Sequence, residues 1–408
     1  MGGTRAVALL ALGSFAMGTD AYAMAGLLPD IGADLDVSVS LAGQSVTAFT
    51  LCYALAAPVL SAVLARWGTR AVLVAALVVF VLANSGTAMA GSYAGLLGTR
   101  ALAGVGAGLF TPAAATAAVA LVPPERRGRA LGLVLGGMSA GTVLGVPLGL
   151  LVAAGSGWRA ALWLITALGL VALLGVATAL PPVRGAAAPS LKDRIGALAR
   201  PRVAVVVAVT FTQTVASLGL YTYLEPVLRS VADVGSAVPY LWVWGIGGVC
   251  GSFLAGTLVD RTGRPARLAV TLLGILGGAL ALLPWTAAVP GLVLLPLLVW
   301  GAVGWAFVVP QQHRLLAHDG GAAAVGLNSS ATYLGGAAGS ALGGLALAHG
   351  LDARLLPLLA AGAALAGVLF HLTVAGRFTG PGPHLTDTAH GAGAAGTTAA
   401  GAPERNAS

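Results

Sequence analysis

Residues 256–264 read GTLVDRTGR, a charged stretch that separates two long apolar runs. A shorter relative of this stretch, RWGTR at residues 66–70, also lies between two apolar runs. Gly68 precedes Gly263 by 195 residues (263 − 68), and each stretch follows the second apolar run of its half of the chain. The sequence therefore predicts two repeats of one helical plan.

Apolar runs make up almost all of the sequence around these two stretches. Of 408 residues, 58% are hydrophobic and 8% are charged, whereas roughly a quarter of the residues of a soluble domain are charged. Runs of about 20 apolar residues, enough for a helix to cross a bilayer, recur from Val7 to Val374. We predict an all-α membrane protein with about twelve transmembrane helices in two six-helix bundles, with the lipid bilayer as its solvent.

Breaks between the runs divide the chain. They lie at residues 31–40, 66–70, 91–93, 122–129, 155–158 and 181–202 in the first half, and at 229–236, 260–267, 288–291, 317–323 and 349–354 in the second. These breaks predict an N-terminal bundle at 5–180, a cytoplasmic linker at 181–202 and a C-terminal bundle at 203–377. Residues 378–408 are rich in Gly, Ala and Thr, which predicts a disordered cytoplasmic tail.

The cationic residues are concentrated in alternate loops. One set of loops carries fourteen Lys and Arg residues, while the opposite set carries only Arg159, Arg229 and Arg354. By the positive-inside rule the richer side is cytoplasmic, and both termini are expected on that side. The net charge of +8 is spread over short loops rather than gathered on one basic face, so we expect no nucleic-acid partner.

Three motifs resemble those of the major facilitator superfamily. Residues 256–264 resemble the loop signature G-x-L-x-D-R-x-G-R, and the first-half copy departs from it at Ser61 and Ala65. Residues 100–108, RALAGVGAG, are similar to the signature R-x-x-x-G-x-G, which is implicated in proton coupling in drug:proton antiporters. Residues 141–149, GTVLGVPLG, resemble the antiporter signature with a variant of its usual G-P-x-x-G-G.

Further similarity at residues 18–20, 26–30, 221–226 and 328–335 is to the bacterial efflux branch that includes chloramphenicol-resistance and sugar-efflux proteins. The resemblance implies the major facilitator fold, a place in the bacterial cell membrane, and export driven by proton entry. It also implies gating or packing roles for the motif residues. These are Arg66, Gly68, Arg70, Gly256, Asp260, Arg261, Gly263, Arg264, Gly145, Pro147 and Gly149.

Two ionisable residues lie inside predicted helices. Asp20 is nine residues before Pro29, which places it roughly 13 Å below the outer end of the first helix, and Arg100 is expected roughly 9 Å below the same face. Burial favours a neutral carboxyl and a nearby guanidinium favours the carboxylate. We hypothesise that Asp20 carries a proton and that Arg100 sets this balance; a purely structural ion pair is the alternative.

Neutral polar residues in the second half are candidates for substrate contacts. Gln213, Thr214 and Asn328 are expected either to line a cavity or to make hydrogen bonds between helices, worth about 1 kcal/mol each. Glu225 precedes Pro226, and the 195-residue offset maps it onto Asp30 (225 − 30). It is expected either to contact substrate or to reach interfacial water.

The fifth and eighth helices carry two further hypotheses. Gly137, Gly141, Gly145 and Gly149 recur every four residues, which predicts one small-residue face for the fifth helix. Tight packing alone explains such a face, and Pro147 suits a helix that flexes. Asp260 is expected to latch the cytoplasmic side shut, with a local surface ion pair as the alternative.

These observations predict a secondary active transporter that couples proton entry to efflux of a small, moderately apolar compound. A sugar or metabolite facilitator, with or without proton coupling, is the alternative within transport. A polytopic membrane enzyme or sensor is a remote alternative, because the sequence contains no H-E-x-x-H, no phosphate-binding loop and no paired carboxylates. Cys52 and Cys250 lie inside predicted helices, so neither a metal site nor a cofactor is expected.

Overall fold

The computed structural model describes residues 2–64, 67–181, 191–232, 237–286, 291–317 and 321–374, and every regular element in these residues is helical. Arg66, residues 182–190 of the predicted linker and the predicted tail lie outside them. In the described residues, eleven helical segments are long and apolar enough to cross a membrane. Helix α16 (Gly321–Ala348), which is rich in Gly and Ser, lies between α3 (Val39–Val63) and α10 (Pro201–Thr222) and is the twelfth long segment. The predicted fold class is confirmed.

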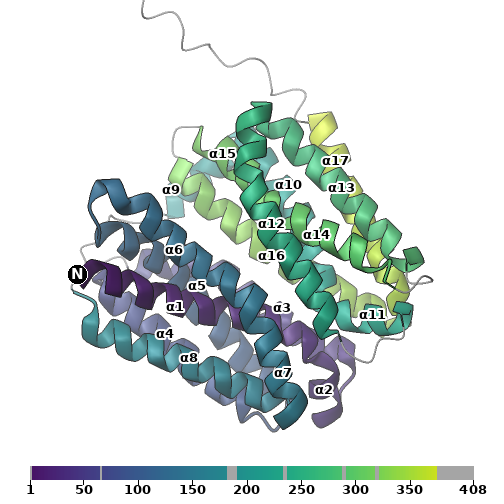
Figure 1. The fold of residues 1–408 in the computed structure, drawn as a ribbon, viewed down its shortest axis with the longest axis horizontal. Helices are drawn as coiled ribbons and strands as arrows, with labels where there is room; N and C mark the ends of the chain where they lie inside the picture. The colour runs from purple at the N-terminus through teal and green to yellow at the C-terminus, as the bar shows by residue number, and fades with distance from the viewer. Residues whose placement is uncertain are drawn as a thin grey trace, which may run out of the picture.

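The two halves lie side by side in the purple-to-teal and green-to-yellow parts of Figure 1. The first half contains, besides α3, helices α1 (Gly2–Ala23), α4 (Thr69–Ala88), α5 (Tyr93–Ala120), α6 (Arg127–Ala140), the π-helical turn η4 (Gly141–Gly145), α7 (Val146–Ser156) and α8 (Trp158–Ala179). The second half contains, besides α10 and α16, helices α12 (Val238–Thr262), α13 (Pro265–Thr286), α14 (Leu294–Ala306), α15 (Val308–Leu316) and α17 (Leu356–Val374). Large apolar side chains such as Leu82, Leu151 and Phe253 project outward, as expected of a surface covered by lipid tails.

Four short elements were not predicted. A 3₁₀ turn η1 (Met24–Gly26) and helix α2 (Leu28–Asp34) continue α1, and α11 (Leu224–Ala232) continues α10. Pro29 lies in the first turn of α2, where a missing N–H costs nothing, so it begins a short helix where the sequence predicted a loop. Helix α9 (Leu191–Leu198) occupies part of the linker predicted at 181–202 and packs against α16, α10 and α3.

The two halves contact each other along α3 and α16, and also near the end of the bundle formed by α2 and α11, which we call the α2 end. There η1 contacts both α10 and α11, and α12 contacts η4 and α7. Along α3 and α16, the rings of Tyr53 and Tyr333 stack with centroids 3.6 Å apart, and Ser340 Oγ donates to Gly43 O at 3.3 Å. The halves are therefore joined by polar as well as apolar contacts.

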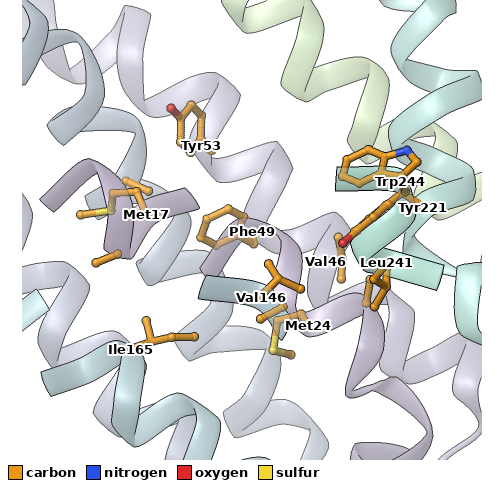
Figure 2. Packing of buried hydrophobic residues seen from close by; sticks show 14 of the residues in the cluster. Met17, Met24, Val46, Phe49, Tyr53, Val146, Ile165, Tyr221, Leu241 and Trp244 are labelled. Carbon is orange, nitrogen blue, oxygen red and sulfur yellow. The ribbon is translucent and has the colours of Figure 1, made fainter. Parts of the chain in front are cut away.

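The buried core continues across this junction. Figure 2 shows Met17, Phe49 and Val146 of the first half in one cluster with Tyr221 and Trp244 of the second. Because lipid tails are as apolar as these side chains, close packing rather than exclusion of water holds such helices together. The site described next lies inside this packed region.

Candidate functional site

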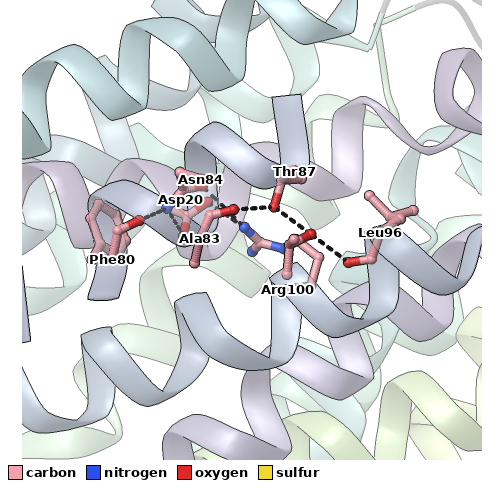
Figure 3. Close-up of polar contacts among 8 residues, drawn as sticks. Asp20, Phe80, Ala83, Asn84, Thr87, Leu96 and Arg100 are labelled. Carbon is pink, nitrogen blue, oxygen red and sulfur yellow. Dashed lines mark hydrogen bonds and ion pairs between the residues drawn. The ribbon is translucent and has the colours of Figure 1, made fainter. Parts of the chain in front are cut away.

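Asp20 and Arg100 form an ion pair in the interior of the first half. Arg100 Nη1 lies 2.6 Å from Asp20 Oδ1, and the side chains are 1% and 0% exposed respectively. Asp20 comes from α1 and Arg100 from α5, and the two face each other in Figure 3. The sequence placed both residues at similar depth, and the structure brings them into direct contact.

Asn84 of α4 completes this cluster. Its Nδ2 donates to Asp20 Oδ2 at 3.3 Å and to Phe80 O at 3.1 Å, and its Oδ1 accepts from Arg100 Nη1 at 3.4 Å. The Arg100 guanidinium also lies 4.5 Å from the centre of the Phe49 ring, a cation–π distance. Both oxygens of the carboxylate therefore have a partner. Asn84 was not predicted, although an amide within an apolar run was the available signal.

The fifth membrane segment holds α1 in place beside this cluster. Thr19 Oγ1 lies 3.0 Å from Phe15 O and 3.2 Å from Gly141 O, so its hydroxyl can donate to either carbonyl. A Cβ on Gly141 would collide with Phe15 O, and one on Gly145 would collide with Thr19 Oγ1. The two helices approach this closely because these positions have no side chain.

The predicted glycine face does not extend to Gly149. A Cβ there would lie 3.9 Å from the Cβ of Ala161 on α8, at ordinary contact distance. Four residues turn an α-helix by about 400°, so a four-residue spacing drifts by about 40° at each repeat, and the π turn at Gly141–Gly145 changes the pitch further. Gly149 and the buried Pro147 therefore belong to the α7 part of the segment, beyond the π turn.

A cavity of about 220 Å³ lies between the halves. Gln213, Thr214 and Asn328, the neutral cavity candidates from the sequence, all line it. The other lining residues are Tyr22, Met138, Thr210, Ser217, Leu218, Trp244, Gly304, Trp305, Phe307, Val308, Gln311, Ser329, Thr332 and Tyr333. Among the described lining residues, only Tyr22 and Met138 come from the first half, and none is charged.

Aromatic rings form much of the cavity wall. The lining residues Tyr22 and Trp244 both pack on Tyr221, which meets Tyr22 edge to face with centroids 5.3 Å apart and lies 4.5 Å from Trp244. The rings of Tyr22 and Trp305 are 6.3 Å apart. The sequence did not identify these rings, because aromatic residues in a membrane protein also gather at the lipid–water interface.

Glu225 lies outside the residues that line the cavity. It is 8% exposed, and its Oε1 accepts hydrogen bonds from Arg229 Nε at 3.1 Å and Nη2 at 2.8 Å. Burial raises the pKa of the Glu225 carboxyl, Arg229 lowers it in part, and the charge of Asp30 raises it. Asp30, the residue onto which the 195-residue offset maps Glu225, is thus close enough for its negative charge to act on Glu225.

The charged loop stretches lie at the opposite end of the helices. Gly263 caps α12 with φ of 58° and donates its N–H to Val259 O at 3.0 Å, a left-handed position that favours glycine. Asp260 is exposed beside it, and within the described ranges no ion pair to it is found. Gly256, Arg261 and Arg264 belong to the same stretch. In the first half, Gly68 is the N-cap of α4 and Arg70 Nη2 donates to Ala177 O of α8.

Comparison with known proteins gives one consistent result. The sequence model of the Major Facilitator Superfamily matches residues 10–343. The chain is 33% identical over 378 residues to a chloramphenicol resistance protein of Streptomyces lividans, covering 88% of this chain and 93% of that protein. It is 30% identical over 369 residues to the inner membrane transport protein YdhP of Escherichia coli K12, covering 88% and 92%.

Solved structures show the same fold. The xylose transporter XylE of E. coli, in a partially occluded inward-open conformation, superposes with a TM-score of 0.71 at 18% identity, over 91% of this chain and 97% of that one. A bacterial homologue of the lysosomal transporter Spinster superposes with a TM-score of 0.65 at 17% identity, over 92% and 95%. These relatives are membrane transporters rather than enzymes.

Proposed function

This chain belongs to the major facilitator superfamily of membrane transporters, and we propose that it exports a small, uncharged, moderately apolar compound in exchange for protons by alternating access. The observation that carries this proposal is the separation of two sites. None of the described residues that line the cavity between the halves is charged, whereas Asp20, with 0% exposure, lies in the first half two residues before the lining residue Tyr22. One site suits a neutral cargo and the other suits a proton.

Asp20 is the proposed proton carrier. A buried carboxylate is tolerated when it is paired and hydrogen-bonded, and Arg100 and Asn84 supply these partners. A proton on Asp20 would cancel its charge and weaken the attraction to Arg100. Tyr22 lies two residues further along α1 and lines the cavity, so occupancy of the cavity and protonation of Asp20 act on the same short part of one helix.

The cavity wall supports the proposed cargo. Flat aromatic faces contact apolar rings, and a few neutral hydrogen-bonding groups fix the orientation of a ligand in a mostly apolar pocket. The name of the S. lividans relative makes chloramphenicol the first compound to test. The relative named as an inner membrane protein and the charge pattern of the loops support the bacterial cytoplasmic membrane, with both termini inside, as the site of action.

Transport driven by a pH gradient tests the proposal. Purified protein is reconstituted into proteoliposomes, and accumulation of radiolabelled chloramphenicol is measured with and without an imposed gradient. We expect gradient-driven accumulation in the wild type and its loss in Asp20→Asn. Asp34→Asn is the matched control, because it removes a half-exposed carboxylate that pairs with Arg159 in the same half. Full gradient dependence in Asp20→Asn would refute the role of Asp20.

A sugar or metabolite facilitator is the second candidate. The amide and hydroxyl groups of Gln213, Thr214 and Asn328 in the cavity favour it, because sugars are bound through such groups and through aromatic faces. Countertransport of radiolabelled sugars without a gradient distinguishes the two. Sugar exchange that persists after the gradient is collapsed, with no effect of chloramphenicol, would support the facilitator.

A further inference from the structure

Most polar side chains of the cavity already have partners within the second half. Gln311 Nε2 donates to Val206 O and to Thr210 Oγ1, both at 3.1 Å. Ser217 Oγ accepts from Trp300 Nε1 at 2.7 Å. Thr214 Oγ1 donates to Thr210 O at 3.0 Å. Two lining hydroxyls of α16 bond to their own helix: Ser329 Oγ donates to Val325 O at 3.1 Å and Thr332 Oγ1 donates to Asn328 O at 3.0 Å.

Two atoms of cavity-lining side chains are exceptions. Asn328 Oδ1, an acceptor, and Trp244 Nε1, a donor, are buried without a hydrogen-bond partner among the described residues. Asn328 is 6% exposed and Trp244 is 2% exposed, and both residues line the cavity. Buried polar atoms are almost always paired, and an unpaired one costs free energy. Both side chains line the cavity through their other atoms, so a ligand there can supply the missing partners once the Asn328 amide and the Trp244 ring turn toward it.

We infer that the cavity selects uncharged aromatic compounds that carry both a hydrogen-bond donor and an acceptor. An N–H or O–H of the ligand donates to Asn328 Oδ1, and an oxygen of the ligand accepts from Trp244 Nε1. The flat part of the ligand contacts the rings of Tyr22 and Trp305, which line the same cavity. Aromatic amides with free N–H or O–H groups belong to this class. The inference rests on the proposed export function and names its cargo.

This arrangement discriminates against two kinds of compound. A charged ligand would find no countercharge among the described residues that line the cavity. A ligand without a donor would leave Asn328 Oδ1 unpaired, and sites built to bond a particular N–H or O–H strongly reject analogues that lack it. Selection therefore depends on hydrogen-bonding capacity as well as on apolar surface.

Binding to the purified whole chain in lipid nanodiscs, without any pH gradient, tests the inference. The probes are chloramphenicol and other uncharged aromatic amides, each paired with a derivative in which every N–H and O–H is methylated. We expect the wild type to bind the parent compounds at least about tenfold more tightly than the methylated ones. Asn328→Leu and Trp244→Phe should each weaken binding of the parent by about tenfold.

Asn328→Leu should also bring the parent-to-methylated affinity ratio close to one. Retained binding of the methylated compound shows that each variant is folded, and Trp163→Phe, on the outward face of α8, is the control for a Trp→Phe change. Equal affinities within every pair in the wild type, unchanged ratios in both variants, or no binding of any amide would overturn the inference. Export of chloramphenicol without this binding pattern overturns the inference alone, whereas the pattern without gradient-driven transport overturns the proposed function alone.

Discussion

Asp20 and Arg100 show how far single residues can be predicted from this sequence. Each would cost roughly 2.5–3.5 kcal/mol in the middle of a bilayer, which marked both as candidates, and the fixed rise of a helix gave their similar depth. The third member, Asn84, could not be predicted, because the sequence does not say which face of α4 turns toward α1. The side-chain contacts of Asn84 follow only from helix packing.

Removing one partner of the buried pair should cost more than removing both. Arg100→Leu leaves the Asp20 carboxylate without its cation, and we expect the free energy of unfolding to fall by about 3–5 kcal/mol. The double variant Asp20→Asn with Arg100→Leu leaves no unpaired charge, so its free energy of unfolding should fall by less. Titration with SDS in mixed micelles measures both values. Additive losses would show that the two side chains are not energetically coupled.

At the scale of elements, the long helices could be predicted from the sequence, but their irregularities could not. Charged and glycine-containing breaks between apolar runs fix where a membrane helix ends, so these positions agree with the structure. The π turn at Gly141–Gly145 was missed, because its glycines have the same spacing in a regular helix. Helices α2, α9 and α11 were missed because amphipathic segments of fewer than ten residues resemble loops in composition.

The contact between α1 and the π turn should tolerate no added methyl group. In Gly145→Ala the new Cβ would collide with Thr19 Oγ1, so we expect a loss of about 1–3 kcal/mol in stability. Gly149→Ala, four residues later, adds a methyl at ordinary contact distance from Ala161 and should be nearly neutral. Melting temperatures of the two purified variants make the comparison. Equal destabilisation would mean that the glycine spacing, and not this contact, matters.

Helix α11 should respond to pH through Glu225. The raised pKa of Glu225 means that its carboxyl binds a proton more tightly in the folded protein than in the unfolded chain. Protonation therefore favours the folded state, and this contribution is complete below the usual glutamate range and is lost as pH rises through the raised pKa. Glu225→Gln mimics the protonated form, so it should raise the melting temperature at about pH 7.5 relative to wild type.

The advantage of Glu225→Gln should disappear at about pH 4, where the wild-type carboxyl also holds its proton. Glu125→Gln, at an exposed position in the 3₁₀ turn η3 (Pro124–Arg126), is the matched control and should change the melting temperature little at either pH. If the melting temperatures of Glu225→Gln and the wild type changed in parallel at all pH values, the Glu225 carboxyl would not contribute to the pH dependence of stability.

At the scale of the whole molecule, the two-half design was predictable and the junction between the halves was not. Repeated loop stretches 195 residues apart mark the repeats. They carry no information about which helices of one half meet the other. The contacts of α12 with η4 and α7, and of η1 with α10 and α11, depend on the conformation that the transporter occupies.

A covalent link at the α2 end should stop alternating access. A Cβ on Gly245 would lie 3.5 Å from Val143 Cγ2 and 3.6 Å from Val143 Cα, which is compatible with disulfide geometry. We expect Val143→Cys with Gly245→Cys, in a background without Cys52 and Cys250, to lose transport on oxidation and regain it on reduction. Each single cysteine variant serves as a control. Undiminished transport in the oxidised double variant would mean that the halves need not separate there.

The unequal contribution of the two halves to the cavity has a consequence for how this protein can change over generations. Nearly all of the lining residues belong to the second half, while Asp20, Arg100 and Asn84 all belong to the first. Mutations that broaden or narrow the range of transported compounds can therefore accumulate in one half while the proposed proton site stays untouched in the other. A lineage under a new toxic challenge could adapt by altering residues 210–333 alone, and an exchange of second halves between relatives would carry a substrate range with it.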